Sequence, residues 1–199
     1  MRNAALLNPL AAALALWLGV LAPAADAELF APRKIKPAGI RRQEPTRIEK
    51  DLADAISPAN SHVIVSLSEQ RAYVMTGEQV YIDTPISSGK RAGMTPTGTF
   101  HIMEKDPDHR SNIYGDFVDK RGRVVRSGVS TKVDSAPSGT HYRGAPMKWF
   151  CRLTSQGVGM HIGILPGYPA SHGCIRLPAE IAPLIYAKVK IGTKVVIEP

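Results

Sequence analysis

Aromatic residues make up only 6% of this chain, and no run of basic residues is interleaved with them. A stacking platform for nucleic-acid bases needs both, so we predict no nucleic-acid partner. Cysteine is scarce as well. Cys151 and Cys174 allow at most one disulfide, and 199 residues are enough to bury a hydrophobic core without it.

A long apolar run is also missing. The stretch at 10–21 has about a dozen residues, whereas a helix that crosses a bilayer needs about 20. Arg2 precedes it, and the small residues of Ala25-Asp26-Ala27 follow it, which is the pattern of a cleavable signal peptide over 1–27. An uncleaved anchor is the alternative that this length disfavours. We therefore predict an exported protein with no stable membrane span after cleavage, and no lipid attachment, since no cysteine lies near the cleavage site.

The net charge of +8 indicates an anionic neighbourhood, and an envelope polymer or a membrane surface agrees with the leader better than nucleic acid does. Residues 28–58 hold many Arg and Lys residues together with four prolines. Proline forbids regular backbone pairing, so we predict a basic, Pro-rich linker here and a globular domain over 59–199.

From His62 onward the apolar residues recur with a period of two. Three short runs, at 63–67, 72–75 and 80–82, are separated by turn residues, which predicts an antiparallel meander. Further strand signals lie at 99–103, 147–153, 158–164 and 193–197.

Two other segments differ from this pattern. Residues 104–145 are rich in charged, Gly and Pro residues, and such a long stretch without periodicity is functional or disordered. We predict that it forms a long covering loop with a small hairpin around Val124-Val125. One amphipathic helix is expected from Pro178 through Ala187. The predicted class is mainly β with one helix on the C-terminal side.

Reactive side chains are concentrated between residues 161 and 176. A free thiol has a pKa near 8.5, so a nucleophilic cysteine needs a basic partner nearby. His161 lies on a predicted strand, and the prolines and glycine of 166–169 let the chain fold back. This return can bring Cys174 opposite His161.

The residues around Cys174 suggest supporting roles. Gly173 lets a substrate carbonyl approach the backbone, where the amides of Gly173 and Cys174 can face a developing oxyanion. Ser171 can orient His172 or donate to the same oxygen. Arg176 shares a face with Cys174 on an extended chain and can hold a substrate carboxylate.

This block resembles the signature of the L,D-transpeptidase family of peptidoglycan enzymes. Its pattern is an upstream His, then Ser/Thr-x-Gly-Cys, an apolar residue and Arg or Asn, and here it reads His161, then Ser171-His172-Gly173-Cys174-Ile175-Arg176. Residues 86–89, 95–100 and 144–150 resemble other family segments, so the likeness covers roughly 62–198. The interval between the histidine and the cysteine element is shorter than in some members.

The resemblance implies a β-sandwich of mixed sheets whose cysteine attacks the carbonyl of an L-to-D peptide bond in a stem tetrapeptide. The terminal D-residue leaves, and an amine takes the acyl group from the thioester, whereas transfer to water makes a carboxypeptidase. His161 corresponds to the family's base, and His172 is second choice. Met147 and Trp149 resemble wall residues of the donor pocket. The expected protein is a carbapenem target, a monomer without cofactor or metal, in the periplasm or cell wall.

Three alternatives compete with this interpretation. Cys174 can pair with Cys151 in a disulfide, although Cys151 lies on an apolar strand without reactive neighbours and is better interpreted as a buried thiol. His161, His172 and Cys174 can supply three ligands of a zinc ion, but no carboxylate stands in a recognisable ligand spacing. The third alternative is a wall-binding module that has lost catalysis.

Overall fold

The computed structural model describes residues 42–199. The predicted signal peptide and the first part of the predicted linker lie outside this range. Within it, no helix is both long and apolar enough to cross a membrane.

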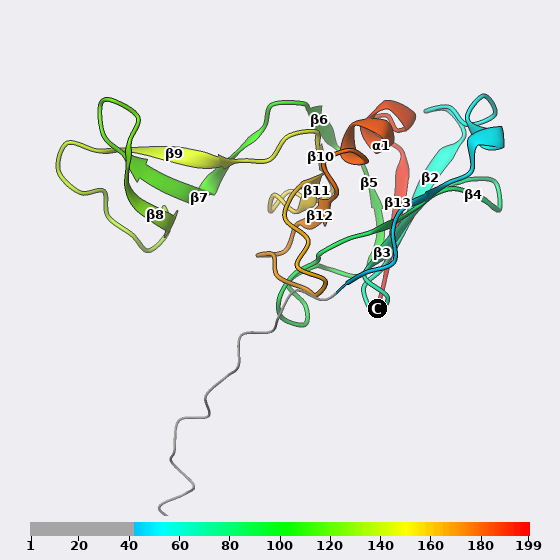
Figure 1. The fold of residues 1–199 in the computed structure, drawn as a ribbon, viewed down its shortest axis with the longest axis horizontal. Coiled ribbons are helices and arrows are strands. Elements are labelled where there is room, and N and C mark those ends of the chain that lie inside the picture. Colours follow the sequence, from blue (N-terminus) through cyan, green and yellow to red (C-terminus); the bar gives the residue numbers. More distant parts are fainter. Residues whose placement is uncertain (1–41) are drawn as a thin grey trace, which may run out of the picture. The chain divides into compact units, whose positions relative to one another are not determined.

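The described chain forms three sheets (Figure 1). The largest contains β1 (Arg47–Ile48), β2 (Ser61–Ser66), β3 (Arg71–Thr76), β4 (Gln79–Pro85), β5 (Gly98–His101) and β13 (Lys194–Glu198). The second contains β6 (Glu104–Asp106), β10 (Phe150–Arg152), β11 (Gly159–Ile162) and β12 (Ile175–Leu177). The third contains β7 (Arg110–Val118), β8 (Val124–Ser130) and β9 (His141–Pro146). The helical segments are the 3-10 turn η2 (Lys50–Leu52) and the helix α1 (Ala182–Lys188).

The six-stranded sheet has the order β1-β4-β3-β2-β13-β5. Strands β2, β3 and β4 follow one another in the sequence, and each pairs antiparallel with the next, which confirms the predicted meander. The C-terminal strand β13 is parallel to β2, with Val195 opposite Val63 and Ile197 opposite Val65. All four of these side chains are buried, because residues of period two share one face of the sheet.

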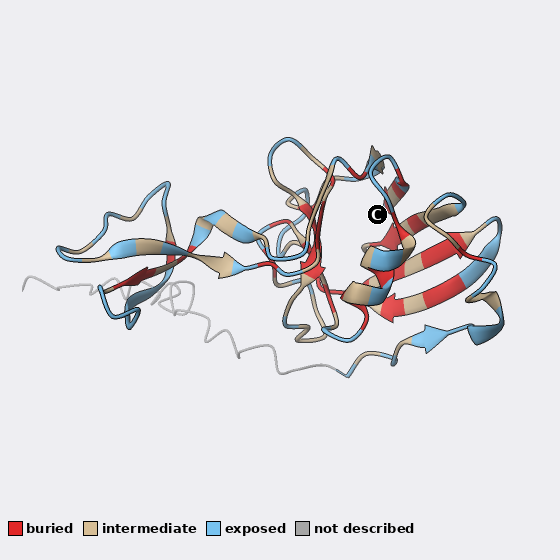
Figure 2. Cartoon of the chain, turned by 90° about the horizontal axis from the view of Figure 1, so that it is seen from above, coloured by how far each residue is buried: buried red, intermediate tan, exposed pale blue. Residues whose placement is uncertain are grey.

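That buried face belongs to the same core as the four-stranded sheet and α1. The shared cluster includes Met160 and Ile175 from the second sheet and Ile185 from α1. In Figure 2 the buried segments run through the strands of both sheets. The prediction of a mainly β sandwich of mixed sheets with one helix is therefore confirmed.

The helix begins later than the sequence suggested. Pro178 opens a turn, in which its carbonyl accepts the amides of Ile181 and Ala182, and α1 proper starts at Ala182. The C-terminal end is held by Lys105 of β6, whose Nζ donates to the Tyr186 carbonyl (2.7 Å) and the Val189 carbonyl (2.6 Å). A cation at these otherwise unpaired carbonyls stabilises the helix end and attaches it to the second sheet.

The described part of the predicted linker packs against the large sheet. Strand β1 pairs with β4, with Ile48 opposite Ile82. Gln43 Nε2 donates to the Ile86 carbonyl (3.0 Å), and Ile56 is only 2% exposed. The folded unit therefore begins earlier than residue 59, because prolines at 45 and 58 tolerate an edge strand and a turn.

The segment predicted as a covering loop is more regular than expected. It forms the three-stranded antiparallel sheet β8-β7-β9, and Val124-Val125 begins β8. Gly115 faces Gly144 across β7 and β9, and a Cβ on either would collide with the opposite backbone. Most residues of this sheet are intermediate or exposed (Figure 2), so the apolar alternation that reveals a half-buried strand is missing from their sequence.

Candidate active site

Strand register brings the two predicted catalytic residues onto one face of the second sheet. Strands β11 and β12 are parallel, with Met160 opposite Ile175 and His161 opposite Arg176. Met160 and Ile175 are buried in the core. The pair of His161 and Arg176, one residue further along each strand, therefore faces the opposite side of the sheet. Cys174 immediately precedes β12 and shares the face of Arg176, two residues later. His161 and Cys174 therefore lie on the same outer face, and both line one cavity.

Cys174 is held as a neutral thiol. Burial raises the pKa of Cys174 above its usual value, although the Gly159 amide and the guanidinium groups of Arg176 and Arg152 oppose this effect. The thiol donates to the Gly157 carbonyl oxygen, with Sγ and O 3.6 Å apart. Because the thiolate is the minor form at neutral pH, the nucleophile needs a base at the moment of attack.

His161 has the protonation state of such a base. It is 7% exposed, and burial lowers its pKa to about 4, with the charges of Arg176 and His109 acting in the same direction. Its Nδ1 lies 2.7 Å from the Ile162 carbonyl oxygen. A carbonyl only accepts, so Nδ1 carries the proton and Nε2 is the basic nitrogen. The imidazole is therefore neutral over the physiological range and can accept a proton.

Ser171 and Gly173 build the loop that carries the thiol. Ser171 Oγ donates to the Cys174 carbonyl (2.6 Å) and accepts the Gly173 amide (3.0 Å). Gly173 has φ +133°, and a Cβ there would meet the Met94 carbonyl oxygen at 2.8 Å. The predicted oxyanion role of the Gly173 amide does not fit this geometry, because that amide is already bonded. Nor does the Ser171 hydroxyl orient His172, since it is bonded within the loop.

Arg176 reaches the same cavity along the surface of β11. The stem of Arg176 lies over Gly163, where a Cβ would approach its Cγ to 2.5 Å. Its Nη1 lies 3.4 Å from the Ile164 carbonyl oxygen. Glycine at 163 thus leaves room for the Arg176 side chain in the cavity that Cys174 also lines.

The cavity has a volume of about 930 Å³ and extends from the Cys174 face of the second sheet to the segment 109–114. None of its lining side chains, all within the described residues, is acidic. Four are basic, namely Arg110, Lys132, Arg152 and Arg176. A cavity of this composition suits a ligand that carries carboxylates.

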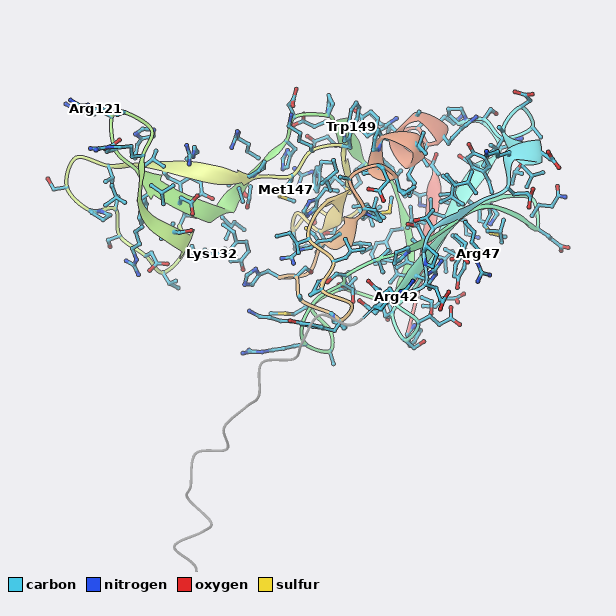
Figure 3. The ribbon with its side chains drawn as sticks, in the orientation of Figure 1. Arg42, Arg47, Arg121, Lys132, Met147 and Trp149 are labelled. Atoms are coloured by element: carbon cyan, nitrogen blue, oxygen red, sulfur yellow. The ribbon has the colours of Figure 1, made fainter. Side chains whose placement is uncertain are left out.

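The remaining predicted site residues differ in whether they line the cavity. Met147 is buried and lines the cavity, whereas Trp149 does not; Figure 3 labels both residues. The Trp149 ring packs edge-on against Tyr186 of α1, with centroids 5.2 Å apart, so its predicted wall role does not fit. His172 is exposed and stacks on Tyr114 with centroids 4.3 Å apart, at the edge of the cavity.

Comparison with known proteins identifies the family of this chain. Residues 60–197 match the sequence model of the YkuD family, the L,D-transpeptidase catalytic domain. The chain belongs to this family. A search among curated proteins finds no match.

Solved L,D-transpeptidases share the fold. An L,D-transpeptidase from Mycobacterium smegmatis is 22% identical with a TM-score of 0.53, covering 70% of this chain and 59% of that chain. One from Stackebrandtia nassauensis is 20% identical with a TM-score of 0.50, covering 73% of this chain and 60% of that one. LdtMt1 in complex with imipenem is 22% identical with a TM-score of 0.51, covering 69% of this chain and 58% of that one. The present chain thus spans about three fifths of the length of these relatives.

Several lining residues of this L,D-transpeptidase domain escaped the sequence analysis. His109, Arg110, Tyr114 and Lys132 all come from the segment predicted as a covering loop, and Arg152 comes from β10. Their sequence carries no motif, although the length and polarity of 104–145 indicated a functional segment.

The structure bears on the disulfide alternative. Both cysteines are free. Cys151 is opposite Met160 in the row that faces the core, whereas Cys174 lies on the outer face. Burial raises the pKa of Cys151 to about 12, so this thiol has little nucleophilic character.

Within residues 42–199, one group of three potential ligand side chains lies close enough together to hold a metal ion. His161, His172 and Cys174 do not come within ligand distance of one another as a group. Three side chains that do, Glu104, Asp106 and His109, are already bonded: His109 to Asp106 at 3.1 Å and Glu104 to Arg152 at 2.5 Å.

Replacing Ser171 by alanine tests the loop that positions the thiol. The change leaves the Cys174 carbonyl and the Gly173 amide without their buried partner, which we expect to lower the free energy of unfolding by about 1–3 kcal/mol. Acylation of Cys174 by imipenem should slow about tenfold, as the loop relaxes, measured by intact-protein mass spectrometry over time. Ser127→Ala, which removes an exposed hydroxyl bonded to Asp116 outside the cavity, is the matched control; it should leave acylation unchanged and lower the free energy of unfolding by at most about 1 kcal/mol. Unchanged acylation in Ser171→Ala would show that the loop holds its shape without this hydroxyl.

Proposed function

We propose that this protein is a peptidoglycan L,D-transpeptidase with Cys174 as nucleophile and His161 as base. The observation that carries the proposal is their common face on parallel strands, with a neutral imidazole and a neutral thiol lining one cavity. His161 Nε2 takes the thiol proton as the sulfur attacks the carbonyl of the L-to-D peptide bond of a stem tetrapeptide. The proton then passes to the amine of the departing terminal D-residue, which leaves a thioester on Cys174.

The negative charge that develops on the carbonyl oxygen of the tetrahedral intermediate needs hydrogen-bond donors nearby. The Gly173 amide is bonded to Ser171, so we assign the oxyanion to the backbone amide of Cys174 itself. Arg176 binds a stem carboxylate beside the reacting bond, Met147 forms a wall of the donor site, and His172 borders its entrance. Ser171 and Gly173 act through the loop, as positioning residues.

An amine acceptor then attacks the thioester and produces a cross-link or an anchored molecule. Transfer to water by the same site, which makes an L,D-carboxypeptidase, is the second candidate. The basic lining of the cavity supports a substrate with several carboxylates in either case. We place the enzyme outside the cytoplasm, in the periplasm or cell wall, on the leader pattern at 1–27, and we propose that it acts as a monomer.

Incubation of the purified protein with defined tetrapeptide muropeptides tests the reaction. The expected products are a cross-linked dimer and the free D-residue, identified by liquid chromatography and mass spectrometry. Tripeptide alone would indicate the carboxypeptidase, and unaltered tetrapeptide would favour a wall-binding module. Activity that a chelator abolishes and zinc restores would favour the metal alternative.

A further inference from the structure

A second histidine lines the cavity in an arrangement that parallels His161. His109 Nδ1 lies 3.1 Å from Asp106 Oδ2, and its side chain is 20% exposed. Asp106 Oδ1 also accepts the amide of Asp108 at 3.0 Å, which keeps the carboxylate oriented. With the proton of Nδ1 directed to Asp106, Nε2 of His109 is the basic nitrogen, and no residue within 42–199 is hydrogen-bonded to it.

The His109 ring is fixed in place by packing. It stacks on Phe150, with centroids 4.2 Å apart and planes inclined by 11°. The His161 ring lies 6.3 Å from that of Phe150 between centroids, and the Arg152 guanidinium lies over the Phe150 ring at 5.2 Å from its centroid. Phe150 is fully buried, and the His109 carbonyl accepts the Met147 amide at 2.8 Å. Two oriented imidazoles thus lie near one aromatic ring, and each lines the cavity that contains Cys174.

The charges around His109 differ from those in the rest of the cavity. Asp106 and Glu104 of β6 lie within 4.8 Å of it, atom to atom, and Glu104 is paired with Arg152 of β10. Asp108 and Arg110 flank His109 in the chain, and the nearby His161 of β11 is neutral at pH 7 because burial lowers its pKa to about 4. An ammonium group is therefore better accommodated beside His109 than elsewhere in a lining without acidic residues.

We propose that the His109–Asp106 pair is the base for the acceptor amine in the second half of the reaction. This inference rests on the proposed function. The acceptor enters as an ammonium ion and must lose a proton before its lone pair can attack. His109 Nε2 takes this proton, Asp106 stabilises the imidazolium, and the free amine attacks the thioester carbonyl. The C–S bond breaks, a second proton from the attacking nitrogen returns to the sulfur by way of His161, and His109 releases its proton to solvent.

The test separates the two halves of the reaction in His109→Gln. The acyl-enzyme is formed with a tetrapeptide donor and then mixed with glycinamide, and both steps are followed by intact-protein mass spectrometry. At pH 7 we expect acylation within twofold of wild type and transfer to glycinamide slower by about 10- to 100-fold. Hydroxylamine, which is neutral at pH 7 and needs no base, should react with both acyl-enzymes at similar rates. Raising the pH until glycinamide is itself neutral should remove most of the difference.

Asp106→Asn is the second variant and should slow transfer to glycinamide about tenfold, again with normal acylation. His141→Gln, which replaces an exposed histidine of β9, is the matched control and should behave as wild type. The proposal is overturned if His109→Gln slows acylation and transfer equally, if it leaves transfer unchanged, or if a chelator alone reproduces its effect. A wild-type protein that forms no acyl-enzyme would instead contradict the proposed function.

Discussion

Cys174→Ser is expected to lose acylation by at least about a thousandfold, with the fold retained. The hydroxyl has nearly the size of the thiol but is far less acidic. His161 is oriented by a backbone carbonyl rather than by the carboxylate that assists a Ser–His pair, so we expect little activation of a serine at this position. The assay is incubation with imipenem or a tetrapeptide donor followed by intact-protein mass spectrometry. Wild type should gain the mass of one acyl group, and peptide mapping should locate it on Cys174.

Cys151→Ala provides the matched control. Cys151 is 2% exposed and faces the core, so its loss should cost about 1 kcal/mol of stability and leave acylation unchanged. An adduct on Cys151, or on another residue of Cys174→Ser, would contradict the assignment. So would a wild-type cell-wall product pattern in a strain that carries Cys174→Ala, because the protein would then act by binding alone.

The placement of His161 and Cys174 on one face of the second sheet was predictable because it depends on the local sequence. Thirteen positions separate the two residues, the intervening prolines and glycines favour a return of the chain, and the motif fixes the order of the residues. The parallel register of β11 and β12 converts this short separation into a shared face. The protonation states were not predictable, because burial comes from the packing of remote segments.

Trp149 and Gly173 show where the motif is insufficient. Trp149 adopts φ +59°, which turns the chain between Met147 and β10, and its ring packs against α1. Nothing in the sequence specifies that contact, since Tyr186 lies far along the chain. Gly173 is needed because a Cβ there would come within 2.8 Å of the Met94 carbonyl oxygen, and Met94 belongs to another segment. Such close approaches depend on tertiary structure.

The third sheet was predicted only as a small hairpin around Val124-Val125, which β7 and β8 form, and its full extent was missed for a different physical reason. Its residues are mostly exposed or half-buried, so they carry no apolar alternation. The sheet is instead stabilised by polar contacts, such as Asp116, which accepts the Ser127 hydroxyl (2.7 Å) and the Gly128 amide (3.1 Å). These bonds lower the pKa of Asp116, and they form between residues that only the completed fold brings together.

His161→Gln is expected to slow acylation by about 10²- to 10⁴-fold at pH 7, the usual contribution of a general base. Glutamine retains a polar side chain of similar length but does not accept the thiol proton. The rate of imipenem or tetrapeptide acylation measures the effect. Thermal unfolding of the same sample shows whether the variant remains folded.

The pH dependence distinguishes a base from a packing residue. Because burial lowers the pKa of His161 to about 4, its imidazole is neutral at pH 5 and above and becomes protonated only in more acidic solution. Wild-type acylation should therefore stay nearly level from pH 7 to 5 and fall as the pH approaches 4. In His161→Gln this fall in rate at low pH, the acid limb of the pH profile, should disappear. The residual rate should rise with pH as the Cys174 thiol ionises, since burial raises the pKa of that thiol.

His172→Ala separates the two histidines of the motif. His172 stacks on Tyr114, and its Nε2 lies 3.2 Å from Lys90 Nζ, so it belongs to the edge of the cavity. We expect about a tenfold loss at most, seen mainly as weaker donor binding, with the acid limb of the wild type retained. Equal losses in the two variants, or a larger loss in His172→Ala, would transfer the role of base to His172. An acid limb near pH 6.5 in the wild type would show that the base is a solvated imidazole rather than the buried one.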